Sequence, residues 1–189
     1  ITVRTAMFAA SRREARELSA ALHVEQVERA RVAGELDAAR EIQLGLLPDT
    51  SALPGLPANI EVSAVLEPAR EVGGDLYDAF MLDERRLFFV VGDVAGKGIP
   101  ASLFMAVGKT LSKSSALRES TSLGDLVTRA NAEISRDNPA QMFITALFGI
   151  LDTESGELRI CNAGHDHPIL VDAVGSIRIL KTAGGPPLC

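Results

Sequence analysis

The chain has 189 residues, a hydrophobic content of 47% and a formal net charge of −6 at pH 7. This length and composition are typical of a folded globular protein with one sizeable core, and they exclude a mainly disordered chain. The acidic balance argues against a nucleic-acid-binding protein, and no apolar stretch approaches the roughly 20 residues of a membrane span.

Residues 1–47 predict one long helix, because they contain no proline and are rich in Ala, Glu, Arg and Leu, whereas Pro48 ends it. Read as heptads, this segment has a seam that is apolar at both ends and polar in its middle. The apolar seam residues are Leu18, Leu22, Leu36 and Leu46. The polar ones in the middle are Glu25 and Arg29, and Gln43 takes a further seam position. The pattern predicts a weak coiled coil, and therefore a homodimer through residues 10–47. An amphipathic helix packed on its own domain is the alternative.

The Pro- and Gly-bearing residues 48–59 predict an extended lead-in to a domain that occupies residues 60–189. Apolar patterns in this domain predict strands at 60–66, 77–82, 86–91, 142–151, 158–162, 168–171 and 177–180, and helices at 101–117 and 123–136. Ser122 with Asp125 resembles a capping box for the second of these helices. Strands, two adjacent helices and strands again indicate an α+β fold rather than a βαβ repeat.

Two aspartates lie in glycine-flanked turns beside the predicted strand 86–91, within Gly73-Gly74-Asp75 and the segment 92–98. Glycine allows the backbone to approach a ligand closely. Carboxylates on tight turns suit a hard divalent cation that prefers oxygen ligands. We therefore predict that Asp75 and Asp93 converge on one or two shared cations in a metal-dependent hydrolase site.

Two other interpretations of the segment 92–98 follow from its residues. The spacing from Gly92 to Lys97 is one residue short of a nucleotide-binding phosphate loop, and Gly98 stands where that loop needs Ser or Thr, which excludes it. Taken alone, Gly92-Asp93 also fits a tight turn whose aspartate caps the following helix.

Five segments occur in an order that resembles the SpoIIE-like (RsbU-like) branch of the metal-dependent protein phosphatase (PPM) family. They are Ala39-Arg40-Glu41-Ile42-Gln43 through Pro48, Arg70 through Asp78, Gly92 through Gly98, Met142-Phe143-Ile144-Thr145 and Asn162-Ala163-Gly164-His165. The resemblance covers most of the chain. It implies a PPM-type β-sandwich flanked by helices in αββα layers, preceded by a linker helix.

The resemblance also implies a mechanism. Asp93 would bridge two Mn²⁺ or Mg²⁺ ions, the backbone carbonyl of Val94 would be a further ligand, and Asp75 would serve one metal. A metal-activated water would then hydrolyse a phosphoserine or phosphothreonine without a covalent enzyme intermediate. By resemblance, the substrate is a STAS-domain anti-anti-sigma factor of a bacterial stress response, and an upstream sensor domain or activator controls the enzyme.

The chain departs from the family pattern at two places. Ala95 stands where the wider family has a histidine that is proposed as general acid, so the proton must come from metal-bound water or another group. We expect His165 to brace its turn by hydrogen bonding rather than to replace that acid. The family's remaining metal ligands lie beyond the segment 184–188, and the chain ends at Cys189, so we expect residues 60–189 to be the N-terminal part of the phosphatase domain.

Two further functions remain open from the sequence. One is a catalytically incomplete fragment with a regulatory and dimerising role through residues 1–47. The other is a metal-dependent hydrolase of small phosphoesters. Cys161 and Cys189 form no motif, which favours a reducing, cytoplasmic setting, and the start at Ile1 predicts an upstream domain.

Overall fold

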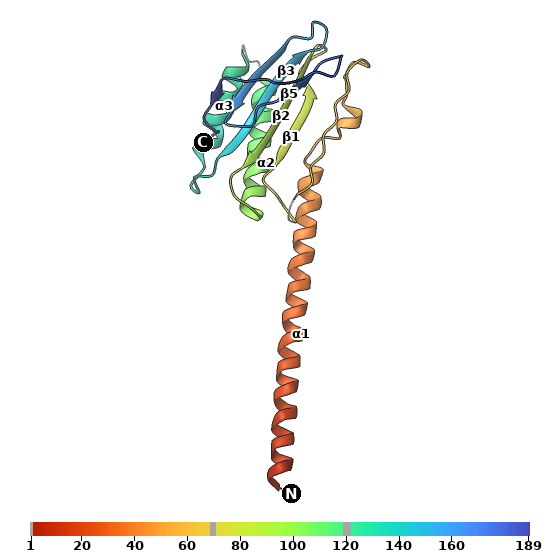
Figure 1. Ribbon diagram of the computed structural model, residues 1–189. Coiled ribbons are helices and arrows are strands. Elements are labelled where there is room, and N and C mark those ends of the chain that lie inside the picture. The colour runs from red at the N-terminus through yellow and green to blue at the C-terminus, as the bar shows by residue number, and fades with distance from the viewer. Residues whose placement is uncertain (1, 69–70, 119–121) are drawn as a thin grey trace. The chain divides into compact units, whose positions relative to one another are not determined.

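The computed structural model describes residues 2–68, 71–118 and 122–189 (Figure 1). The chain forms two compact units, residues 1–41 and residues 42–189. Arg70, which belongs to one of the family-like segments, lies outside the described residues. Among the described helices, none combines the length and the apolar character needed to cross a membrane.

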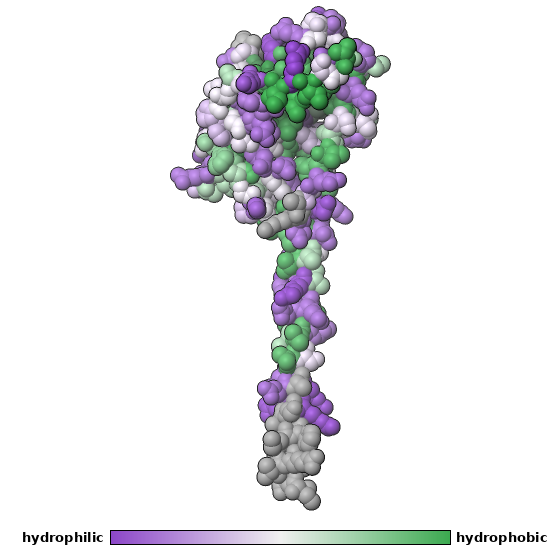
Figure 2. Space-filling view, in the orientation of Figure 1, coloured by the Kyte–Doolittle hydropathy of each residue, from purple (hydrophilic) through white to green (hydrophobic). Residues whose placement is uncertain are grey.

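The first unit is formed by helix α1 (Thr2–Gly45), whose last turn belongs to the second unit. Ion pairs between residues four apart support the helix on its surface; they join Arg13 to Glu17 and Arg29 to Glu25. Five large apolar residues are exposed, namely Leu18, Leu22, Val24, Val27 and Val32, whereas Leu36 is half-buried. Figure 2 shows apolar surface interspersed with polar surface along this helix.

The second unit contains a five-stranded sheet in the order β1-β2-β3-β4-β7 and a separate two-stranded hairpin, β5-β6. The strands are β1 (Leu76–Met81), β2 (Arg86–Val94), β3 (Ile144–Asp152), β4 (Leu158–Ala163), β5 (Ile169–Val171), β6 (Ile177–Ile179) and β7 (Gly184–Gly185). Neighbours in the main sheet are antiparallel, except that β7 runs parallel to β4. A short turn joins β1 to β2, whereas α2 and α3 lie between β2 and β3 in the chain; β2 pairs with both strands and lies between them.

Helices α2 (Ile99–Leu117) and α3 (Leu123–Arg136) cover one face of the main sheet (Figure 1). The core between them is apolar and fully buried; it includes Phe88, Val90, Met105, Leu126, Ile134 and Phe148. The other face carries a smaller cluster of Leu53, Ala79 and Leu87, packed against the lead-in segment. Residues 87–90 of β2 are covered on both faces, so they form a continuous apolar run instead of an alternating one.

The predicted α+β fold is confirmed, and so is the start of α3. The Ser122 hydroxyl accepts a hydrogen bond from the Asp125 N–H at 3.1 Å, as in a capping box. Leu126, Ala130 and Ile134 all face the core. Helix α2 begins at Ile99, earlier than predicted, because Pro100 occupies the first turn, where its missing N–H costs nothing.

The predicted strand at residues 60–66 is wrong, because this segment forms no ladder in the structure. Ile60 and Val62 pack against the sheet face that bears Leu87, and the Ala64 N–H donates to the Thr50 hydroxyl at 3.2 Å. The partial alternation of the sequence therefore reflects packing of an extended chain rather than strand pairing. The two-residue strand β7 was not predicted, since two glycines carry no apolar signal.

Candidate metal centre

The antiparallel hairpin β1-β2 brings Asp75 and Asp93 together. Asp75 directly precedes β1 and Asp93 is the second-last residue of β2, and the register pairs Leu76 with Gly92. The Val94 N–H donates to the Gly74 carbonyl at 3.3 Å, which extends the contact past the ladder. The two carboxyls lie within hydrogen-bonding reach of each other, and both residues are exposed.

Glycines make this close approach possible. A Cβ atom at Gly74 would lie 2.8 Å from the Val94 carbonyl oxygen and 3.2 Å from Asp93 Oδ1. A Cβ atom at Gly92 would lie 2.8 Å from the Thr145 carbonyl oxygen. Gly74 therefore lies next to the Asp93 carboxylate and the Val94 carbonyl, two of the three oxygen groups proposed from the sequence, and it directly precedes the third, Asp75.

The electrostatics of the pair favour a cation. The pKa of Asp93 is raised, first because the carboxyl is partly shielded from water and then because the Asp75 carboxylate is adjacent. The nearby His165 and the hydrogen bond from the Val94 N–H act in the opposite direction and lower this pKa. A divalent ion between the carboxylates removes their mutual repulsion, so this donor chemistry fits a hard cation.

Thr145 of β3 and His165, in the turn after β4, lie beside the end of β2. The Thr145 hydroxyl lies 3.0 Å from His165 Nδ1 and 3.4 Å from the Asp93 carbonyl oxygen. The His165 N–H donates to Asn162 Oδ1 at 2.8 Å, and the Asn162 amide donates back to the His165 carbonyl at 2.9 Å. The Asn162 side chain thus braces the turn through the main chain of His165, whereas the imidazole, which was expected to brace the turn, contacts Thr145.

Gln43 is a site residue that the sequence analysis assigned to a different role, a seam position of the coiled coil. In the structure it is buried, with 4% of its surface exposed, in the last turn of α1. Its amide donates to the Gly73 carbonyl at 2.6 Å, and its Oε1 accepts from the Gly73 N–H at 3.1 Å. Gln43 therefore holds the peptide that leads into Gly74 and Asp75. Its position inside a family-like segment was the signal that could have identified it.

Asp78 is a second residue without a predicted role. It is 1% exposed, and its Oδ2 accepts from Lys109 Nζ of α2 at 2.8 Å, with Lys113 Nζ at 3.6 Å. Its Oδ1 accepts from the Ala79 N–H at 3.0 Å. This buried ion pair fixes α2, the helix that follows the Asp93 turn, against β1.

The described residues contain no group of three or more His, Cys, Asp and Glu side chains that could hold a metal ion. The candidate donors among the described residues are therefore two carboxylates and one backbone carbonyl, fewer than the six oxygens that such ions usually take. An open hollow of about 420 Å³ adjoins the centre and is lined by residues 63–67, Asp75, Tyr77, Val91 and His165, among others.

Comparison with known proteins gives a family match. The family model of stage II sporulation protein E (SpoIIE) matches residues 83–189, which include Asp93 and Val94 but not Asp75.

Two relatives extend the similarity towards the N-terminus. Protein IcfG of Synechocystis is 34% identical over 176 residues, which cover 79% of this chain and 27% of that protein. The phosphoserine phosphatase RsbU of Bacillus subtilis is 27% identical over 135 residues, covering 71% of this chain and 39% of that protein. The chain thus spans well under half the length of these relatives.

Solved structures share the fold. The RsbU and RsbW domains of Rv1364c from Mycobacterium tuberculosis superpose with a TM-score of 0.57 at 32% identity, covering 64% of this chain and 33% of that chain. The SiaA PP2C domain of Pseudomonas aeruginosa superposes with a TM-score of 0.67 at 19% identity, covering 85% and 63%. The second likeness, at this identity, concerns the fold alone.

Proposed function

This chain belongs to the SpoIIE family, and we propose that it is the metal-binding part of a serine/threonine protein phosphatase of the PPM type. The observation that carries the proposal is the convergence of Asp75 and Asp93, from two ends of a hairpin, on one exposed point of the surface. The similarity to the phosphoserine phosphatase RsbU supports the same reaction class.

In this proposal, Asp93 and Asp75 hold Mn²⁺ or Mg²⁺ with the Val94 carbonyl. Such ions supply an activated water and neutralise the charge of a phosphate group. The protein's own contribution is to position: the ladder of β2 with β3 fixes Asp93, Gln43 holds the turn before Asp75, and the Thr145–His165 pair supports the strand end. Ala95 follows Val94 and offers no acid–base group, so the proton for the leaving group must come from elsewhere.

The exposure of the centre supports a protein substrate over a small phosphoester. Asp75 and Asp93 are both exposed, and the adjoining hollow is open, with Val65 and Val91 presenting apolar surface beside it. A small-molecule enzyme usually encloses most of its ligand. We propose that the substrate is a phosphoserine- or phosphothreonine-bearing regulatory protein, by resemblance a STAS-domain anti-anti-sigma factor.

A metal-binding measurement tests the centre. We expect Mn²⁺ to bind the full chain and to raise its melting temperature, because a ligand that binds the folded state stabilises it. Asp93→Asn should abolish most of this shift, whereas Asp83→Asn, an exposed aspartate at the other end of β2, should leave it unchanged. In the full-length protein, Asp93→Asn should also abolish Mn²⁺-dependent release of phosphate from a phosphoserine peptide. Equal metal binding by both variants would remove Asp93 from the centre.

The small donor set is compatible with a second proposal, a regulatory fragment that lacks activity alone. The two proposals differ in a direct measurement. Phosphate release by this chain with Mn²⁺, lost in Asp93→Asn, supports the enzyme. Metal binding without any phosphate release supports the regulatory fragment.

We also propose that α1 pairs two copies of the chain. The exposed apolar residues of α1 support this pairing. Gln43 is hydrogen-bonded to Gly73 of its own chain, so the pairing seam would end before Gln43. Leu18→Glu with Leu22→Glu should convert a dimer into a monomer in sedimentation experiments, whereas Arg16→Glu, off the seam, should not. A wild-type chain that sediments as a monomer at high concentration would contradict the pairing.

A further inference from the structure

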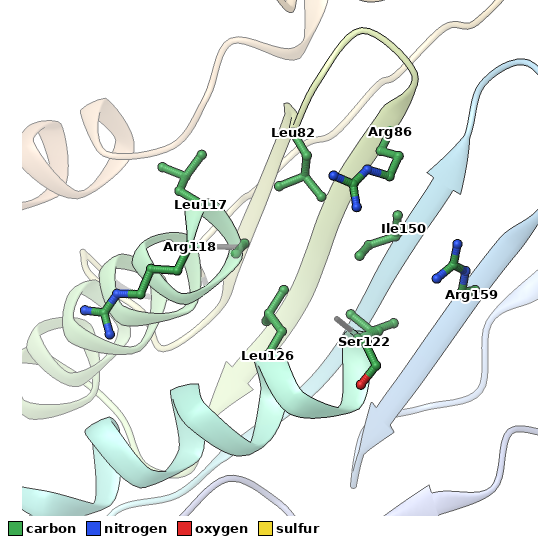
Figure 3. Close-up of a pocket in the computed structure, with 10 residues that line it drawn as sticks. Leu82, Arg86, Leu117, Arg118, Ser122, Leu126, Ile150 and Arg159 are labelled. Carbon is green, nitrogen blue, oxygen red and sulfur yellow. The ribbon is translucent and has the colours of Figure 1, made fainter. Parts of the chain in front are cut away.

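A hollow of about 420 Å³ lies on the helix-covered face of the sheet, between the last turn of α2 and the first turn of α3 (Figure 3). Its floor is apolar and buried; it includes Ala116, Leu123, Leu126 and Ile150. Three arginines line it as well, Arg86, Arg118 and Arg159. It lies at the start of β2, roughly 23 Å along the strand from Asp93 at about 3.3 Å per residue, so it is separate from the metal centre.

Two of these arginines occupy positions where the strand pattern calls for core residues. Arg86 lies two residues before the buried Phe88 on β2, so both side chains point to the helix-covered face. Arg159 pairs with Ile150 across β3 and β4 and shares its face. Helix α2 ends at Leu117 and α3 begins at Leu123, and these two helix ends line the hollow beside the arginines. Cationic groups therefore stand at the mouth of an apolar floor.

The arrangement of the guanidinium groups distinguishes the three arginines. Figure 3 shows Arg86 and Arg159 on either side of Ile150, whereas the Arg118 guanidinium points away from the hollow. Arg118 instead donates to Glu133 at 2.7 Å. Arg86 and Arg159 are thus the two guanidinium groups that face the hollow.

Each of the two arginines already has a carboxylate neighbour, and these contacts are weak competitors. Arg86 Nε donates to Asp83 at 2.6 Å, and Arg159 Nε donates to Glu157 at 3.0 Å. All four side chains are about half exposed, and ion pairs of this kind contribute little in water. Both contacts use Nε, whereas a ligand carboxylate can be met by the terminal nitrogens of the same guanidinium groups.

We propose that this hollow binds an amphiphilic carboxylate, with the apolar tail on the floor at Leu126 and Ile150 and the carboxylate between Arg86 and Arg159. The volume lies within the range of about 300–1,000 Å³ that is usual for small-molecule pockets. The apolar floor selects a tail, and the two planar cations select a carboxylate over an uncharged or cationic head. Neither the family match nor the metal centre requires such a site.

Octanoate is a suitable probe, with octylamine as the same tail on a cation and inorganic phosphate as an anion without a tail. We expect octanoate to shift the methyl NMR signals of Leu126 and Ile150 at millimolar concentration. The exposed methyl groups of Ile177 on β6 should stay unshifted, because they report non-specific contact with the tail. Octylamine and phosphate should leave all of these signals unchanged.

Arg86→Gln with Arg159→Gln should weaken octanoate binding about tenfold, as expected for the loss of two partly exposed charge contacts. Arg178→Gln, an exposed arginine on β6, is the matched control and should bind as the wild type does. The unperturbed methyl spectrum of each variant verifies the fold. The proposal is overturned if octanoate causes no shifts, if octylamine shifts the same signals, if phosphate alone competes with octanoate, or if the double variant binds as well as the control.

Discussion

Replacing Gln43 by alanine tests whether the end of α1 positions the metal centre. The change removes a buried side chain whose amide makes both hydrogen bonds with the Gly73 peptide, at 2.6 and 3.1 Å. Each such bond contributes roughly 0.5–1.5 kcal/mol net, so the pair contributes about 1–3 kcal/mol to the stability of the second unit. Gly73 lies two residues before Asp75, so the same loss loosens the turn that carries this carboxylate.

The assay uses the single tyrosine of the chain. Tyr77 lies in β1 and its hydroxyl donates to the Pro48 carbonyl at 3.4 Å, so its fluorescence reports unfolding of the second unit. Because the chain has no tryptophan, this signal is free of interference. We expect Gln43→Ala to lower the free energy of unfolding in urea by about 1–3 kcal/mol. Mn²⁺ affinity should fall by about three- to tenfold, since part of this energy also orders Asp75.

Gln43→Glu separates the two hydrogen bonds. The introduced carboxylate can still accept from the Gly73 N–H, but it faces the Gly73 carbonyl without a proton to donate. Its pKa in the folded state is therefore raised above the usual value of about 4.3. A raised pKa gives stability that is present below the unfolded value and lost as pH rises. This variant should approach wild-type stability near pH 4 and fall below it at pH 7.

Glu41→Ala is the matched control, because Glu41 is exposed on the same helix, half a turn away. It should change neither unfolding nor Mn²⁺ affinity. If Gln43→Ala matches this control within about 0.3 kcal/mol, the Gly73 contact contributes nothing and the positioning argument fails. If stability falls while Mn²⁺ affinity stays constant, Gln43 anchors the helix without ordering Asp75.

Three further predictions concern stability away from the centre. Lys109→Met should lower the free energy of unfolding in urea by about 3 kcal/mol, because the buried Asp78 carboxylate then has only the more distant Lys113 as a partner. A loss below about 1 kcal/mol would show that Lys113 fully replaces Lys109. Ser115→Ala should stabilise by about 1 kcal/mol, because this fully buried hydroxyl has no hydrogen-bond partner among the described residues, and destabilisation would reveal such a partner. The pKa of Asp152 is lowered to about 2, chiefly by the Ser155 N–H, so its stabilising effect is complete above the usual value near 4 and is lost as pH falls towards 2; Asp152→Asn should flatten this part of the pH–stability curve.

Much of the fold follows from local patterns in the sequence. The α3 helix was predicted because Ser122 and Asp125 start it and Leu126, Ala130 and Ile134 repeat at helical spacing, and all of these signals agree. The strands at residues 77–82 and 86–91 were predicted from two apolar runs on either side of a short polar turn, and they form the hairpin of β1 and β2. The strand prediction for residues 60–66 was wrong because an extended chain that packs on a sheet shows the same alternation of apolar and polar residues as a strand that pairs.

The buried face of α2 shows a second limit of sequence patterns. Leu103 and Val107, the most apolar residues on one side, are exposed, whereas Gly108, Lys109 and Ser112 face the sheet. A Cβ atom at Gly108 would collide with the Ile144 side chain, which selects glycine there, and the lysine is buried because Asp78 lies opposite to it. A hydrophobicity pattern cannot reveal either reason, since each depends on a partner that is distant in sequence.

The two aspartates of the candidate centre differ in how firmly they are held. Asp93 lies in β2 and pairs with Thr145 of β3, so the ladder with β3 holds its backbone. Asp75 precedes the first ladder pair of β1, and its turn is held from outside by Gln43. A displacement of the last turn of α1 should therefore move Asp75 more than it moves Asp93. We propose that regulation through the helix adds the Asp75 carboxylate to the centre or removes it, while the Asp93 carboxylate stays fixed.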